Sequence, residues 1–219
     1  MDLIEGIETR RSCRAYKPAP VPEEIIRKIL ETAKWSPSFS DSQPWEVAVV
    51  SGAKKDELVE MLSGLSEAGT RPHLEIPTPK EWPTEADERM KEHHAHHSAY
   101  LNIEQGGEEQ RPRRRKPDFY GAPCAVFLFM DKTMTEWSVF DIGLFCQSLI
   151  LAAHSYGVGS CLQAMMVLYP DEIKKFLGIP DTKKLVLGIS LGYPDTESRE
   201  YGYKSERMEL DDFVAWHSE

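Results

Sequence analysis

Three arginines and a serine stand within five residues near the start of the chain, in the stretch RRSCR of residues 10–14. Alternate residues of an extended segment share a face, so Arg10, Ser12 and Arg14 would point the same way. Two guanidinium groups and a hydroxyl on one face suit a phosphate group or an electron-rich carbonyl edge. A solvated cluster of surface arginines would explain this stretch alone equally well.

A second polar stretch, SPSFSDSQPW, lies between a helix expected to end at Trp35 and a strand expected over residues 46–50. It is rich in hydroxyl and amide side chains, and a proline near each end restricts its backbone. A polar loop held rigid between two regular elements is well suited to bind a ligand. The alternative interpretation is a plain turn.

The chain is organised around a helix expected to begin near Phe140 and to end near Tyr156. It is apolar almost all round and must be buried on most sides, but its apolar run is short of the ~20 residues that a membrane span needs. Gly157 is expected to end it in a left-handed conformation. A tight corner through Gly159 then leads into a strand and lets a backbone approach something flat or bulky. A core helix followed by a simple turn is the alternative.

The composition bounds the class of protein. The 219 residues, 41% of them hydrophobic, are enough for one α/β domain or two small ones, and the net charge of −10 argues against a general nucleic-acid binder. No signal peptide or transmembrane run is expected, and the four scattered cysteines are typical of reduced, buried thiols. We therefore expect a cytoplasmic protein without disulfides, zinc site or membrane partner.

The periodic pattern fails over residues 66–117, where prolines and charges dominate. We expect an excursion over the surface there, acting as a cover or lid. For its cluster His93–His97 a solvated helix face is preferred to a metal site, since no cysteine or well-spaced carboxylate completes a coordination set. A weak site at His93 and His97, and attraction of an anion by the basic run 111–116, stay open. Elsewhere there is no internal repeat, and no GxGxxG supports a Rossmann dinucleotide site.

Taken in order, these segments resemble the nitroreductase family of flavin enzymes. The resemblance rests on RRSCRAY, SPSFSDSQPWEVAVV, GVGSCLQ, LGYP and a basic residue followed by MELDDFV, and it covers nearly the whole chain apart from the excursion. It implies a single α+β domain over residues 1–219, with a mixed, mostly antiparallel sheet flanked by helices. It also implies an intertwined homodimer with FMN at the interface, touched by both chains.

The resemblance assigns the site residues one at a time. Arg10 and Ser12, joined by Arg207 from the tail, would hold the FMN phosphate end. Arg14 would face the flavin pyrimidine edge, where a positive charge stabilises the anionic reduced flavin. The polar loop would reach over from the partner chain, and the strand after the glycine corner would lie along the flavin. The expected cofactor-binding set is Arg10, Arg11, Ser12, Arg14, Ser36, Pro37, Ser38, Phe39, Asp41, Gln43, Leu162, Gln163, Ala164 and Arg207.

One member of this set departs from the family pattern. Asp41 stands where an asparagine is common. A carboxylate beside the flavin is less favourable than an amide unless a base pairs with it, so direct contact by Asp41 is in question.

The resemblance implies an oxidoreductase with a ping-pong mechanism. NAD(P)H would reduce the flavin and leave, and a nitroaromatic, a quinone or a similar acceptor would then bind the same face. No side-chain acid or base is required, and an anionic aromatic is the favoured acceptor. The alternatives are an FMN-binding or sensing module without turnover, and a family member with reductive dehalogenase or flavin-destruction activity. A metal-binding role through the histidines is the remotest.

Overall fold

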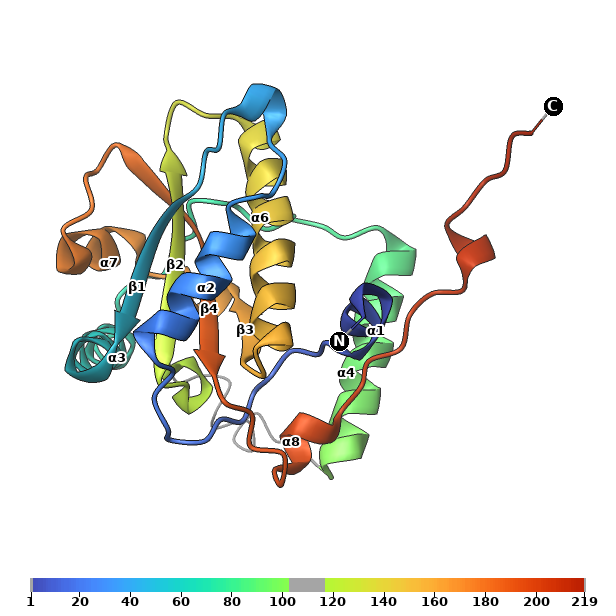
Figure 1. Ribbon diagram of the computed structural model, residues 1–219, viewed down its shortest axis with the longest axis horizontal. Helices are drawn as coiled ribbons and strands as arrows, with labels where there is room; N and C mark the ends of the chain where they lie inside the picture. Colours follow the sequence, from blue (N-terminus) through green and yellow to red (C-terminus); the bar gives the residue numbers. More distant parts are fainter. Residues whose placement is uncertain (1, 103–116, 219) are drawn as a thin grey trace.

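The computed structural model describes residues 2–102 and 117–218 (Figure 1). The basic run of residues 111–116 lies outside the described residues. In chain order the elements are α1 (Leu3–Thr9), α2 (Glu23–Ala33), η1 (Phe39–Asp41), β1 (Glu46–Ser51), α3 (Gly52–Glu67), α4 (Thr84–Leu101), η3 (Phe119–Gly121), β2 (Cys124–Asp131), α6 (Glu136–Ser155), β3 (Gly159–Gln163), η4 (Ala164–Val167), α7 (Pro170–Leu177), β4 (Lys183–Gly192), α8 (Arg199–Gly202) and η5 (Leu210–Asp212), where η marks a short 3-10 helix.

Four strands form one sheet in the order β1-β2-β4-β3, and each neighbouring pair is antiparallel. The apolar strand β2 lies inside the sheet and is buried on both faces. Because alternate residues of a strand point to opposite faces, Val126 and Leu128 enter the core on one side, and Phe127 and Phe129 enter it on the other. Two hydrophobic layers therefore share this one strand.

Helices cover both faces of the sheet (Figure 1). On one face α2 and α6 contribute the fully buried Ile29 and Leu149 to a single cluster. On the other face α3 and α7 contribute Leu58 and Ile173 to the second cluster. This is the α+β arrangement that the resemblance predicted.

The central helix α6 ends where the sequence predicted, and Gly157 follows with a φ of 71°. Within the described residues it is the one helix that is long and apolar enough to cross a membrane. Its residues Leu149 and Ala153 are fully buried in the protein core, as in the core helix of a globular domain. Its first turns are different, because Trp137 and Phe140 are 66% and 60% exposed.

The arginine stretch runs along the edge strand β3. Ser12 forms an isolated parallel bridge with Ser160, and the Cys13 N–H donates to the Ser160 carbonyl at 2.8 Å. A Cβ at Gly159 would lie 2.9 Å from the Cys13 side chain, which is closer than packed atoms allow. The segment that packs closely against the glycine corner is therefore, in part, the arginine stretch of the same chain.

The excursion contains α4, an 18-residue helix whose extent the sequence did not predict. The segment before it is fixed to the body of the domain through Glu75. This carboxylate accepts hydrogen bonds from the Leu185 N–H at 2.6 Å and from the ammonium group of the fully buried Lys174 at 3.0 Å. In Figure 1 α4 stands away from the sheet, beside the C-terminal segment, whose Tyr203 ring contacts the His97 ring of α4.

Candidate functional site

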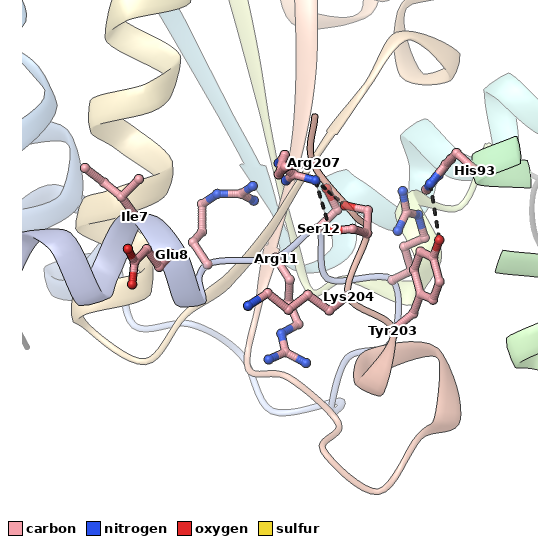
Figure 2. A pocket seen from close by; sticks show the side chains of 11 residues that line it. Ile7, Glu8, Arg11, Ser12, His93, Tyr203, Lys204 and Arg207 are labelled. Atoms are coloured by element: carbon pink, nitrogen blue, oxygen red, sulfur yellow. Dashed lines mark hydrogen bonds between the residues drawn. The ribbon is translucent and has the colours of Figure 1, made fainter. Parts of the chain in front are cut away.

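A cavity of about 550 Å³ opens between α1, α4 and the C-terminal segment (Figure 2). Five of the side chains around it are cationic and one is a carboxylate, in a chain whose net charge is −10. We call it the arginine pocket. Its lining consists of Ile7, Glu8, Arg10, Arg11, Ser12, Arg14, His93, Tyr203, Lys204, Ser205 and Arg207.

The structure brings together the arginine and serine residues that the sequence proposed from the two ends of the chain. Arg10, Arg11, Ser12 and Arg14 all line the cavity, and Arg207 joins them from the tail. Arg11 is held on the tail itself, since it donates to the Tyr201 carbonyl at 3.3 Å and lies over the Tyr201 ring.

The tail fixes Arg207 through its own backbone and a hydroxyl. One guanidinium nitrogen, Nη1, donates to the Ser205 hydroxyl at 2.6 Å and to the Glu206 carbonyl at 2.7 Å. Figure 2 shows this group at the same wall as Ser12.

Electrostatics in the pocket favour an anion. Burial lowers the pKa of Arg10 from its ordinary value, and the charge of Arg207 lowers it further. Burial also lowers the pKa of His154 at the end of α6, with Arg10 and Arg11 adding to the effect. Because the positive charges of Arg10 and Arg207 repel each other in the folded chain, a bound anion would relieve this repulsion.

The sequence interpretation missed one rim of the pocket, formed by His93 and Tyr203. The two side chains meet with His93 Nδ1 3.3 Å from the Tyr203 hydroxyl oxygen. The predicted solvated histidine face is wrong at His97, which is 3% exposed and packs edge-on against Tyr203. The i, i+4 spacing of the two histidines was the available signal. Among the described residues no group of three or more His, Cys, Asp or Glu side chains is placed to hold a metal.

The strand after the glycine corner does not line the arginine pocket. Gln163 turns its side chain into the core, where its amide donates to the Ser190 hydroxyl. Leu162 and Ala164 are exposed on either side of it. The Gln163 side chain is therefore directed into the protein and away from the surface.

Ser36, at the start of the polar loop of residues 36–43, contacts Ser148 in the middle of α6, but Phe39 lies at the end of that helix away from the arginine pocket. It is fixed by Asp141 near the start of that helix, whereas Thr9 of α1 bonds His154 in its last turn, at 3.0 Å. These two positions on α6 are separated by ~20 Å along the helix axis. Within one chain the loop and the arginine pocket are not brought together.

The loop is internally bonded and its backbone is unusual. Ser40, Asp41 and Gln43 have φ values of 49°, 57° and 44°, in the left-handed region that non-glycine residues rarely adopt. The Gln43 N–H donates to the Ser38 hydroxyl at 2.9 Å, and the Gln43 side-chain amide donates to Asp41 at 3.0 Å. The partner of the Asp41 carboxylate is thus an amide of the same loop.

Three exposed aromatic rings surround this loop. The Phe39 ring stacks on Trp137 with a centroid distance of 6.1 Å, and Trp137 meets Phe140 edge-on at 6.5 Å. All three are at least 60% exposed. The loop and the first turns of α6 therefore present an aromatic surface that the described part of this chain leaves exposed.

A family model described as "Nitroreductase family" matches residues 7–193, which include the arginine stretch, the polar loop and the glycine corner. The chain belongs to the nitroreductase family. The match ends before Lys204 and Arg207, so the role of the tail rests on the geometry of the arginine pocket.

Individual nitroreductases match along most of the chain. Nitroreductase NfnB of Mycolicibacterium smegmatis is 35% identical over 95% of this chain and 88% of its own length. The 4-nitrobenzoate reductase of Pseudomonas putida is 30% identical over 89% and 86%. The crystal structure of the FMN-dependent nitroreductase NfnB from Mycobacterium smegmatis in complex with NADPH superposes with a TM-score of 0.91 at 32% identity, covering 98% and 97% of the two chains. The resemblance seen in the motifs is thus confirmed.

Proposed function

We propose that this nitroreductase is an FMN-dependent oxidoreductase that uses NAD(P)H to reduce nitroaromatic, quinone or similar acceptors. The observation that carries the proposal is the arginine pocket, which gathers Arg10, Ser12, Arg14 and Arg207 from opposite ends of the chain. The NfnB structure is described as FMN-dependent and in complex with NADPH, and two relatives are named 4-nitrobenzoate reductases.

The residues present fit FMN. Its phosphate carries close to two negative charges at neutral pH. Binding this phosphate would therefore offset the repulsion between the positive charges of Arg10 and Arg207. Guanidinium groups bind such an anion with paired, charge-assisted hydrogen bonds. Ser12 offers a hydroxyl in the same pocket. These residues would hold the phosphate end, and the exposed Leu162 and Ala164 of the neighbouring strand would flank the ring.

When bound, FMN supplies the redox chemistry by accepting a hydride from NAD(P)H and passing electrons to the acceptor. The protein supplies position and electrostatics. Arg14 would stabilise negative charge on the bound ring, and the His93–Tyr203 contact joins α4 to the tail at the rim of the pocket. No side-chain acid or base is assigned to this reaction.

The position of the polar loop supports a homodimer with FMN at the interface. Phe39 is bonded to Asp141, ~20 Å along the α6 axis from His154 at the end of the helix near the arginine pocket. We therefore expect a second copy of the chain to bring Phe39 to the flavin. The exposed rings of Trp137 and Phe140 beside it would be covered by that copy. The two sites of such a dimer would each contain residues from both chains.

We further assign residues 1–219 to one domain, with the excursion of residues 66–117 as a lid whose helix α4 supplies His93 to the pocket. The four free, buried cysteines favour the cytoplasm as its compartment. The acidic net charge disfavours nucleic acid as a partner.

The test is the visible absorption spectrum of the purified protein, before and after anaerobic addition of NADH or NADPH. We expect an oxidised-flavin spectrum that bleaches with at least one donor and recovers when 4-nitrobenzoate or a quinone is added. Bound flavin that neither donor bleaches would indicate a binding module. Colourless protein that takes up no added FMN would overturn the proposal.

A further inference from the structure

Asp141 is a buried carboxylate on the side of α6 that faces the polar loop. It is 3% exposed, and both of its oxygens lie within hydrogen-bond distance of the Phe39 N–H, at 3.1 and 3.2 Å. A buried carboxylate is retained in a protein core only where hydrogen bonds compensate its desolvation. Its bond to the loop backbone is therefore a strong local constraint.

The loop is fixed to one face of α6 at two points. The Ser36 hydroxyl donates to the Ala33 carbonyl and lies 2.8 Å from the Ser148 hydroxyl, and Asp141 receives the Phe39 N–H. Asp141 and Ser148 are seven residues apart, so they lie on the same side of the helix. The helix thus presents two anchors, spaced two turns apart, to a short stretch of loop.

The backbone between these anchors and β1 is strained. Ser40, Asp41 and Gln43 are all in the left-handed region without being glycine. Such conformations persist only where the surroundings over-determine them, and they cluster at ligand-binding sites. Gln43 contributes to this by donating to Ser38 and Asp41. The bond from the Phe39 N–H to Asp141 ties this strained network directly to the core helix α6.

Phe39 links the anchor to the surface of the loop. Its N–H is held by Asp141, while its ring is 65% exposed and stacks on Trp137. The direction of the ring therefore depends on the backbone that Asp141 fixes. Figure 1 shows η1 against the first turns of α6, at the end of the helix away from α1.

We infer that Asp141 is a positioning residue, which holds residues 38–43 in this backbone form so that the loop completes the flavin pocket of the partner chain. The inference rests on the proposed function, because it requires the dimer and the cofactor. It goes further by assigning the order of the loop to one buried carboxylate outside the proposed cofactor-binding set.

The first experiment compares Asp141→Ala with Asp131→Ala in the FMN-loaded protein. Asp131 is a matched control, because its carboxylate accepts the Thr133 N–H at 2.9 Å in a turn outside both the pocket and the loop. In D141A we expect amide hydrogen exchange over residues 38–43 to rise about tenfold or more, with kcat/KM for the acceptor falling by a similar factor. D131A should leave both unchanged. Unchanged exchange in folded D141A would overturn the inference.

Asp141→Asn keeps an oxygen that accepts the Phe39 N–H while it removes the charge. We expect its exchange over residues 38–43 to rise by less than in D141A, and its kcat/KM to recover most of the loss. This isosteric variant also keeps the test decisive if D141A does not fold. An Asn variant with wild-type exchange and a D141A-like loss of activity would contradict a role through the loop backbone.

The second experiment tests whether Asp141 acts on the partner. D141A chains are co-expressed with chains that carry Arg10→Ala and Arg207→Ala, each with its own tag. Random pairing makes about half of the dimers mixed, and each mixed dimer has one intact site, so about a quarter of wild-type activity should return. Activity equal to the average of the two separate variants would overturn action in trans. Wild-type protein without flavin would instead refute the proposed function itself.

Discussion

His93 Nδ1 lies 3.3 Å from the Tyr203 hydroxyl oxygen, and this contact joins the helix of the excursion to the C-terminal segment at the rim of the arginine pocket. The two residues are far apart in sequence and both line the cavity. Opening the pocket on this side therefore requires that α4 and the tail separate.

We predict that Tyr203→Phe loosens this rim slightly and that Tyr203→Ala loosens it much more. The Phe variant loses one side-chain hydrogen bond, typically a two- to tenfold effect, but keeps the ring that packs against His97. The rate of FMN release, followed by the rise of flavin fluorescence, should thus increase in the order wild type, Y203F, Y203A. Equal release rates in all three proteins would show that the rim does not retain the cofactor.

Arg207→Ala should weaken FMN binding by ~10- to 100-fold, because charge-assisted hydrogen bonds to the phosphate are lost. Fluorescence titration of flavin-free protein measures this dissociation constant. The matched control is Arg27→Ala, whose guanidinium forms an exposed pair with Glu23 on α2 and should leave FMN affinity unchanged. If R207A bound FMN with wild-type affinity, the tail would not be part of the phosphate site.

The thiols should be inert in the folded protein. Burial raises the pKa of Cys13 to about 11 and that of Cys124 and Cys146 to about 12, and it also raises the pKa of Cys161. Since the thiolate is the reactive form, a disulfide reagent at about pH 8 should titrate none of them rapidly. In denaturant all four free cysteines should react. A fast-reacting thiol in the native protein would contradict this burial.

Lys174→Met should destabilise the domain by about 3 kcal/mol, because it leaves the partly buried Glu75 without its closest ammonium partner. Tm should then fall by roughly 6–12 °C. Lys28→Met, which breaks an exposed pair with Glu24, is the matched control and should change Tm little. A similar fall in Tm in both variants would mean that the burial of Lys174 adds nothing to the stability that its ion pair provides.

The same site predicts a pH dependence. Burial alone would lower the pKa of Lys174, but hydrogen bonds to Glu75 and Asp171 outweigh it and the pKa is raised. The folded state therefore holds this proton more tightly than the unfolded chain does. The resulting stability is complete below the unfolded lysine pKa of ~10.4 and is lost as pH rises through the folded pKa. Thermal unfolding followed from about pH 10 upward should show a steeper decline in the wild type than in K174M.

Local patterns in the sequence located most of the fold. The apolar run of β2, the end of α6 before Gly157 and the arginine stretch were each visible in a few adjacent residues. Periodicity did not reveal α4, because its apolar residues are few and its packing surface is supplied by histidines and tyrosines.

The candidate site was predictable only in part. The motifs named the residues that gather in the arginine pocket, but not Tyr203 or His93, whose contact joins segments that are distant in the chain. The same holds for Asp141, which reads as a polar interruption of an apolar helix until the Phe39 N–H is seen to point at it. Such pairings depend on tertiary geometry, which local spacing does not encode.

The rigidity of α6 limits where residues can be inserted into or deleted from this chain. Asp141 holds one functional segment and His154 contacts the other, with uninterrupted helix between them. Inserting one residue there would advance the downstream part by ~1.5 Å and rotate it by ~100°, so both attachments could not survive together. We therefore expect descendants of this sequence to vary in length within the excursion and to keep the interval from Asp141 to His154 constant.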